Sequence, residues 1–232
     1  MLLGDHAGLA IPQALGDLGL PRVELERHIG WDIGVAGVGA HLARLLDACF
    51  IRQRYSRLVI DCNRDPVRPD AIPTVSDGTA IPGNAGLSVA DALARRDAVF
   101  APYPDRITRE LDGRRAAGRP TTLVSLHSFT PVMAGFLRPW RYGVLHLNDS
   151  PLSKAMLARL QTAVGSAAGD NQPYAMDGID YTIPHHAGGR GLDYLEIEIN
   201  QGLIGEPAGQ EAVARFLAPL LTAALADIRT PN

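Results

Sequence analysis

The sequence alternates between short runs of apolar, often β-branched residues and longer stretches in which apolar positions recur with helical spacing. This alternation is typical of an α/β layer fold. Strands are predicted in the opening residues 1–4 and in four later runs, at 58–62, 121–126, 142–147 and 194–199. Helices are predicted over 38–52, 89–97, 153–164 and 211–228, the last of them an amphipathic helix that covers the sheet.

The chain shows no sign of a second domain. It has 232 residues, no internal repeat and no linker long enough to separate two units, so we expect one domain over 1–232. The segment from Pro66 to Gly86 follows a predicted strand and is rich in Pro, Gly, Asp and Ser. A long loop of this kind is more often functional than idle, and we expect it to contribute to a site.

Composition and charge exclude several classes of protein. The hydrophobic fraction of 46% is too high for disorder, and no apolar run reaches the roughly 18–20 residues of a membrane helix. A formal charge of −3 argues against a nucleic-acid partner. The first ten residues lack the pattern of a secretory signal, and two cysteines cannot form a disulfide framework. We therefore expect a soluble, cytoplasmic protein without membrane or nucleic-acid partners.

Polar residues cluster where the predicted strands end. Asp5-His6 follows the first strand, Asn63-Arg64 follows the run at 58–62, and His127-Ser128 follows the run at 121–126. Glu196 and Glu198 lie within the last predicted strand. Ligands of open α/β sheets bind at the carboxyl ends of the strands, so we expect these side chains to converge on one rim.

The residue types on this rim fit metal-assisted hydrolysis. Two imidazoles with a carboxylate are the ligands of a catalytic zinc, and a further glutamate can act as general base toward water. An arginine beside an asparagine suits a substrate carboxylate, because the guanidinium matches its two oxygens. No GxSxG, HExxH or phosphate-loop motif offers another chemistry.

Several motifs, taken in their order along the chain, resemble the N-formylglutamate amidohydrolase family. This family is related to the zinc carboxypeptidases and acylamino-acid deacylases. The motifs run from residue 5 to about residue 204 and are Asp5-His6-Ala7, HIGWDIG from His28, DCNRDP from Asp61, HSFTP from His127, Tyr181-Thr182 and EINQ from Glu198.

The resemblance implies a three-layer α/β fold of the phosphorylase/hydrolase and zinc-carboxypeptidase type, with a central mixed, mostly parallel sheet flanked by helices. It implies that His6 and His127 bind zinc and that Glu198 is the general base. Asn63 and Arg64 would bind the substrate carboxylate. The implied activity is zinc-dependent hydrolysis of the amide C–N bond of an N-acyl amino acid, such as N-formylglutamate, in amino-acid degradation.

The chain also departs from its relatives. The carboxypeptidases take two metal ligands from an HxxE spacing, but His6 is followed by Ala7, Gly8 and Leu9. The acidic ligand is then expected elsewhere, with Asp32 as the candidate; alternatively, Asp32 hydrogen-bonds a ligand histidine. Family members often carry an arginine at the position of Asn200, and its loss could change the substrate.

Other assignments have alternatives. Arg64 could pair with Asp61 or Asp65 instead of with substrate, and Glu196 is expected to lie on the opposite face of the strand from Glu198. His186 is a further candidate for lining the pocket and binding substrate.

Two arginines and a histidine near these motifs are assigned no role in the site. Arg44 and Arg57 are interpreted as structural or solvated, and His28 as a packing or surface residue.

The function also has alternatives. The same site could hydrolyse another acylated amino acid or a peptide. The chain could also be a small-ligand binding protein of this fold that has lost catalysis.

Overall fold

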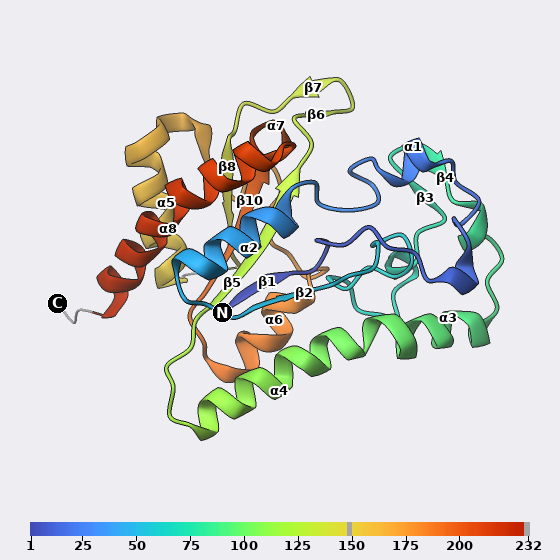
Figure 1. Ribbon diagram of the computed structural model, residues 1–232, viewed down its shortest axis with the longest axis horizontal. Helices are drawn as coiled ribbons and strands as arrows, with labels where there is room; N and C mark the ends of the chain where they lie inside the picture. The colour runs from blue at the N-terminus through green and yellow to red at the C-terminus, as the bar shows by residue number, and fades with distance from the viewer. Residues whose placement is uncertain (148–149, 230–232) are drawn as a thin grey trace.

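The computed structural model describes residues 1–147 and 150–229 and is built around a six-stranded sheet (Figure 1). The strand order is β2-β1-β5-β10-β8-β9. The strands are β1 (Leu2–Gly4), β2 (Phe50–Arg52), β5 (Leu123–Phe129), β8 (Tyr142–Leu145), β9 (Ala168–Asp170) and β10 (Tyr194–Asn200). Two small hairpins stand apart from it, β3 (Val75–Ser76) with β4 (Thr79–Ala80), and β6 (Val132–Met133) with β7 (Phe136–Leu137).

The sheet is mixed but mostly parallel. β2, β1, β5 and β10 pair in parallel, β8 runs antiparallel to β10, and β9 runs parallel to β8. Helices cover both faces, as the resemblance implied. The helices are α1 (Arg22–Leu25), α2 (Val35–Leu45), α3 (Val89–Arg95), α4 (Pro102–Ala116), α5 (Pro151–Val164), α6 (Thr182–His186), α7 (Gln201–Ile204) and α8 (Pro207–Arg229).

A separate hydrophobic core packs against each face of the sheet. Leu195, Ile197 and Ile199 of β10 belong to the core that includes residues of α2, α5 and α8. Leu3, Leu123 and Leu145 belong to the other core, which includes residues of α4, α6 and the segment between β2 and α4. Figure 1 shows the helices of the two cores on opposite sides of the sheet. Because successive residues of a strand alternate between faces, the polar residues between the Ile and Leu positions of β10 all lie on the α4/α6 face.

Most predicted elements are confirmed. β1, β5, β8 and β10 overlap the strands predicted at 1–4, 121–126, 142–147 and 194–199, and α3, α5 and α8 overlap the helices predicted at 89–97, 153–164 and 211–228. Helix α4, which begins with two prolines in its first turn, was not anticipated. None of the described helices is both long and apolar enough to cross a membrane.

The strand predicted at 58–62 is wrong. Leu58, Val59 and Ile60 are buried, but their backbone turns instead of joining the sheet. The carbonyl of Leu58 accepts from Asn84 Nδ2 at 2.9 Å, and that of Val59 from Arg95 Nη1 at 3.1 Å. Side chains therefore satisfy the carbonyls that a neighbouring strand would have satisfied, and a short apolar run does not distinguish the two cases.

The helix predicted over 38–52 is too long at its carboxyl end. α2 stops at Leu45, Asp47 has a positive φ of 47°, and the chain then enters the edge strand β2. Gly39 in this helix is needed for packing, because a Cβ there would lie 2.3 Å from the Phe50 ring. The helix thus lies directly on the strand that the sequence pattern had merged with it.

Candidate active site

A cavity of about 460 Å³ opens at the carboxyl end of the parallel strands on the α4/α6 face. β1 leads into His6, β5 carries His127 and β10 carries Glu196 and Glu198. The lining residues include the predicted site residues His6, Asp32, Asn63, Arg64, His127 and Glu198. The structure therefore brings together almost every residue that the sequence singled out.

His6, Asp32 and His127 form a candidate metal site. All three are buried, and each offers a ligand atom within 4.8 Å of the others. Asp32 Oδ2 lies 3.0 Å from His127 Nδ1 and 3.7 Å from His6 Nδ1. The carboxylate thus stands where both imidazoles direct their Nδ1 atoms.

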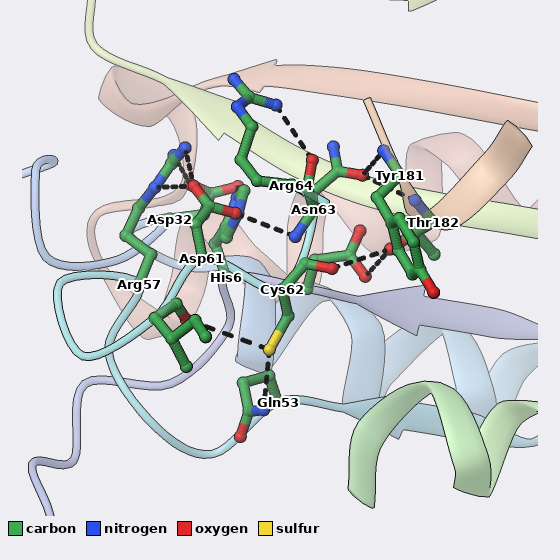
Figure 2. A network of polar contacts seen from close by, with 12 residues as sticks. His6, Asp32, Gln53, Arg57, Asp61, Cys62, Asn63, Arg64, Tyr181 and Thr182 are labelled. Carbon is green, nitrogen blue, oxygen red and sulfur yellow. Dashed lines mark hydrogen bonds and ion pairs between the residues drawn. The ribbon is translucent and has the colours of Figure 1, made fainter. Parts of the chain in front are cut away.

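The opposite ring nitrogens are each held by a second carboxylate. His6 Nε2 lies 2.6 Å from Asp61 Oδ1 (Figure 2), and His127 Nε2 lies 3.1 Å from Asp5 Oδ2. A neutral imidazole that donates from Nε2 keeps its Nδ1 lone pair free for a metal, and such carboxylate partners are usual around metal-binding histidines. His6 Nδ1 is in fact buried without a hydrogen bond. These donors fit a divalent metal.

The two outer carboxylates are themselves fixed. Asp61 Oδ2 accepts from Arg57 Nη2 and Nε at 2.6 and 3.1 Å (Figure 2), and Asp5 accepts from Ser125 Oγ and Thr182 Oγ1 at 3.1 and 2.9 Å. Burial would raise the pKa of Asp61, but Arg57 and His6 hold it well below its usual value. Both anions are therefore retained in the interior to orient the histidines.

The electrostatics of the histidines follow from this arrangement. Burial alone would lower the pKa of His127, but Glu196, Asp32 and Asp5 outweigh it and raise that pKa well above its usual value. The surrounding carboxylates thus create a site that favours positive charge. The same negative potential would favour the binding of a metal cation.

Glu198 and Glu196 stand on the cavity floor. The expectation that they lie on opposite faces is wrong, because residues two apart in a strand share a face, and both line the cavity. Neither carboxyl accepts a hydrogen bond from any described residue, and the Oε2 atom of each is buried without a partner. Burial raises the pKa of Glu198 to about 7 and that of Glu196 to about 8.

Asn63 and Arg64 form part of the cavity wall opposite the sheet. The Asn63 Oδ1 atom accepts from the backbone N–H groups of Tyr181 and Thr182 at 3.0 and 2.9 Å. Arg64 Nη1 donates to Asp180 Oδ1 at 3.3 Å. It also donates to the carbonyl of Asn63 at 3.0 Å (Figure 2). Arg64 therefore pairs with Asp180, and not with either aspartate suggested by the sequence, while its Nη2 group makes no hydrogen bond to the described residues.

Two residues that were read as structural or surface residues also line the cavity. Arg57 holds Asp61, and its Nη1 lies 3.7 Å from Asp32 Oδ1. His28 lies at the rim with Nε2 3.4 Å from Asp77, which comes from the predicted functional loop. Arg57 lies in Ser56-Arg57, shortly before the DCNRDP motif, and His28 begins the HIGWDIG motif, which was the available signal. Which residues they contact depends on turns that sequence periodicity does not encode.

Two further predicted positions lie elsewhere. His186 in α6 is fully buried and is not among the cavity-lining residues. Burial lowers its pKa to about 4, consistent with a neutral ring packed edge-on against His185. Asn200 caps α7 by accepting from the N–H of Gly202, and donates to the carbonyl of Trp140. Asn200 therefore stabilises the turn after β10.

Fold and site together define an α/β protein with a mixed, mostly parallel sheet and a buried His/Asp/His candidate metal site. The chain belongs to the N-formylglutamate amidohydrolase family, whose family model matches residues 1–205. No curated protein matches the sequence.

Two solved structures share the fold. The gene product Atu2144 from Agrobacterium tumefaciens is 41% identical, with a TM-score of 0.95 over 99% of this chain and 91% of the other. An N-formylglutamate amidohydrolase from Ralstonia eutropha JMP134 is 20% identical, with a TM-score of 0.67 over 97% of this chain and 92% of the other. The second likeness concerns the fold alone.

Proposed function

We propose that this protein is a zinc-dependent amidohydrolase that cleaves the amide bond of an N-acyl amino acid of the N-formylglutamate type. One observation carries the proposal. Two buried histidines turn Nδ1 toward one aspartate while other carboxylates hold their Nε2 atoms, and the unpartnered Glu198 lies in the same cavity. Family membership supports amide hydrolysis as the reaction class.

His6, His127 and Asp32 would hold the metal. Two imidazole nitrogens and one carboxylate form a donor set typical of catalytic zinc, with a position left for water or substrate. When bound, zinc supplies Lewis-acid polarisation of the acyl carbonyl and lowers the pKa of water. Asp61 and Asp5 contribute by keeping both rings in the orientation that presents Nδ1.

Glu198 moves the proton. Its carboxylate takes a proton from the attacking water and passes it to the nitrogen of the leaving amine as the C–N bond breaks, giving a carboxylic acid and a free amino acid. A pKa of about 7 suits both transfers near neutral pH, and no hydrogen bond from the described residues restrains the carboxyl. Bound substrate would fill the cavity and exclude competing water.

Arg64 would bind the substrate carboxylate. Its Nη2 group has no hydrogen-bond partner among the described residues, and the side chain lines the same cavity as the candidate metal site. Asn63 would support this contact by fixing the backbone of Tyr181 and Thr182 next to it. The substrate would then reach from the metal ligands to the opposite wall.

The proposal is tested by metal analysis and a hydrolysis assay on the same preparations. The wild-type protein should bind one zinc per chain and, when zinc-loaded, release formate and glutamate from N-formylglutamate. His127→Ala should lose most of the zinc, whereas His41→Ala, at a histidine on α2 outside the cavity, should keep it. Full zinc retention by the His127→Ala protein would overturn the metal assignment.

A further inference from the structure

Glu196 is a buried carboxyl that the proposed mechanism does not use. It is 2% exposed, lines the cavity and accepts no hydrogen bond from the described residues. By contrast, Asp5, Asp32 and Asp61, which are also buried, each accept at least two hydrogen bonds. A buried carboxyl without protein partners is costly unless a ligand group satisfies it.

The register of the sheet places Glu196 deeper in the cavity than the candidate metal ligands. On β5, Glu198 lies beside His127, whereas Glu196 lies beside Ser125, two residues further from the carboxyl end of the strand. On β8, Glu196 faces Leu145, which also lines the cavity. This part of the cavity therefore extends beyond the place where the amide bond would be cut, as a pocket for an amino-acid side chain would.

The charges around Glu196 disfavour an anionic ligand group. Burial raises the pKa of Glu196 most, and the like charges of Asp180, Glu198 and Asp5 add to it. Together they outweigh the opposite charge of His127, so the pKa rises to about 8. Of the two cavity-lining arginines, Arg64 is paired with Asp180 and Arg57 with Asp61. A second substrate carboxylate would meet acids here, whereas an N–H donor would meet an unused acceptor.

We propose that Glu196 is a specificity-determining residue that accepts a hydrogen bond from an N–H group in the substrate side chain, and thereby selects a carboxamide over a carboxylate. This inference rests on the proposed function and refines its substrate class to N-acyl amino acids with an amide side chain. A primary carboxamide suits Glu196 whether the acid is ionised or neutral, because the amide both donates and accepts. A carboxylate can pair with it only when Glu196 carries a proton.

The test compares N-formylglutamine with N-formylglutamate, which have nearly the same shape and differ in this one group. Their Kd values are measured by titration calorimetry at about pH 9, where Glu196 is ionised, on the zinc-loaded Glu198→Gln protein, which should bind without turnover. We expect N-formylglutamine to bind at least about tenfold more tightly, since a site that pairs with an N–H group rejects the analogue lacking it. Adding Glu196→Gln should shift the Kd ratio at least about tenfold toward N-formylglutamate, because the new amide can donate to a carboxylate.

Asp177→Asn is the matched control. Asp177 also lines the cavity but is exposed, so its substitution removes the same charge without changing the floor, and the Kd ratio should stay as it was. Tighter binding of N-formylglutamate to the protein that retains Glu196, a ratio unchanged by Glu196→Gln, or an equal shift in Asp177→Asn would each overturn the proposal. Failure of the wild-type protein to hydrolyse either compound, with the Kd ratio as expected, would refute the proposed function and leave the subsite standing.

Discussion

Two sets of buried carboxyl groups lie in or next to the same cavity and differ in their hydrogen bonds and in their pKa values. Asp5, Asp32 and Asp61 lie on loops at the sheet edge and are saturated with hydrogen bonds from histidines, hydroxyls, backbone N–H groups and Arg57. Glu196 and Glu198 lie on β10 and have no such partners among the described residues. The pKa values of the aspartates are lowered and those of the glutamates are raised.

The difference separates carboxyls that fix geometry from carboxyls that remain available. Asp5 and Asp61, which are already engaged by several donors, cannot change partners without exposing buried charge, so each holds a histidine in one orientation. A buried glutamate without donors can take up or release a proton, or accept one from a ligand, at little structural cost. Substitutions in the two sets should therefore have different consequences for metal binding, turnover and stability.

The largest effect is expected at Glu198. Glu198→Gln preserves the shape of the side chain but removes the base, so kcat for N-formylated amino acids should fall on the order of 10²–10⁴. Because the residue is not among the three candidate ligands, zinc content should stay at the wild-type level. Steady-state kinetics and metal analysis on one preparation measure both quantities, and near-normal kcat would remove Glu198 from the mechanism.

A smaller effect is expected from an aspartate that orients a ligand. Asp61→Asn should lower zinc affinity roughly 10–100-fold, because His6 loses the anion that fixes its ring. Asp65→Asn is the control, since Asp65 is exposed and its side chain accepts a hydrogen bond from the backbone N–H of Val67. Competition with a chelator gives the affinities; equal values for the two variants would mean that Asp61 serves only to hold Arg57.

Arg64→Lys should raise KM with little change in kcat. A lysine ammonium cannot reproduce the planar fork that meets a carboxylate, so KM for an N-formyl amino acid should increase about tenfold. Arg68→Lys, at an exposed arginine paired with Asp70, should leave KM unchanged. If a substrate with its α-carboxylate converted to a carboxamide were turned over equally well by wild type, Arg64 would serve only to hold Asp180.

The sequence predicted the strands and helices of this fold better than the irregular segments that connect them. Strand β5 is fully buried, β10 is buried except at its two end residues, and their apolar or alternating patterns were clear. The run at 58–62 is equally apolar, but Asn84 and Arg95, far along the chain, satisfy its backbone. Such long-range partners are invisible to a local pattern, so burial was predicted correctly and the strand was not.

The candidate site shows the same limit. His6, His127 and Glu198 could be placed because each lies in or just after a strand of the sheet. Asp32 emerged only because the HxxE spacing was missing, and the structure places it within the candidate metal site. Arg57 was missed because its contacts with Asp61 and Asp32 arise from a turn in the irregular segment.

The smallest effect concerns the stability of the metal-free protein. An unfolded Glu196 ionises near its ordinary pKa of 4.5, whereas the folded one ionises near 8, so between these values the folded protein binds more protons. The contribution of Glu196 to the free energy of unfolding should then decrease as pH rises from about 5 to 8. Each extra bound proton contributes at most about 1.4 kcal/mol per pH unit.

Other buried groups set the limits of this window. Glu198 acts in the same direction up to pH 7, and His127, with its raised pKa, adds to it above 6.5. The aspartates, with lowered pKa values, stabilise the fold above about 3.8 and lose that contribution only as the pH falls further. They therefore do not oppose the trend between pH 5 and 8. His186 and the Met1 amino group do oppose it, because their pKa values are lowered to about 4 and about 6, and comparison with Glu196→Gln separates the contribution of Glu196 from theirs.

Urea unfolding in the presence of a chelator at pH 5.5, 6.5 and 7.5 would measure this trend. Glu196→Gln should raise stability most at pH 7.5 and flatten the pH dependence by up to one proton, because glutamine does not ionise. Glu206→Gln, at an exposed glutamate ahead of α8, should keep the wild-type slope. If Glu196→Gln kept that slope as well, Glu196 would already be ionised in the folded protein, and the contrast between the two sets of carboxyls would reduce to hydrogen bonding alone.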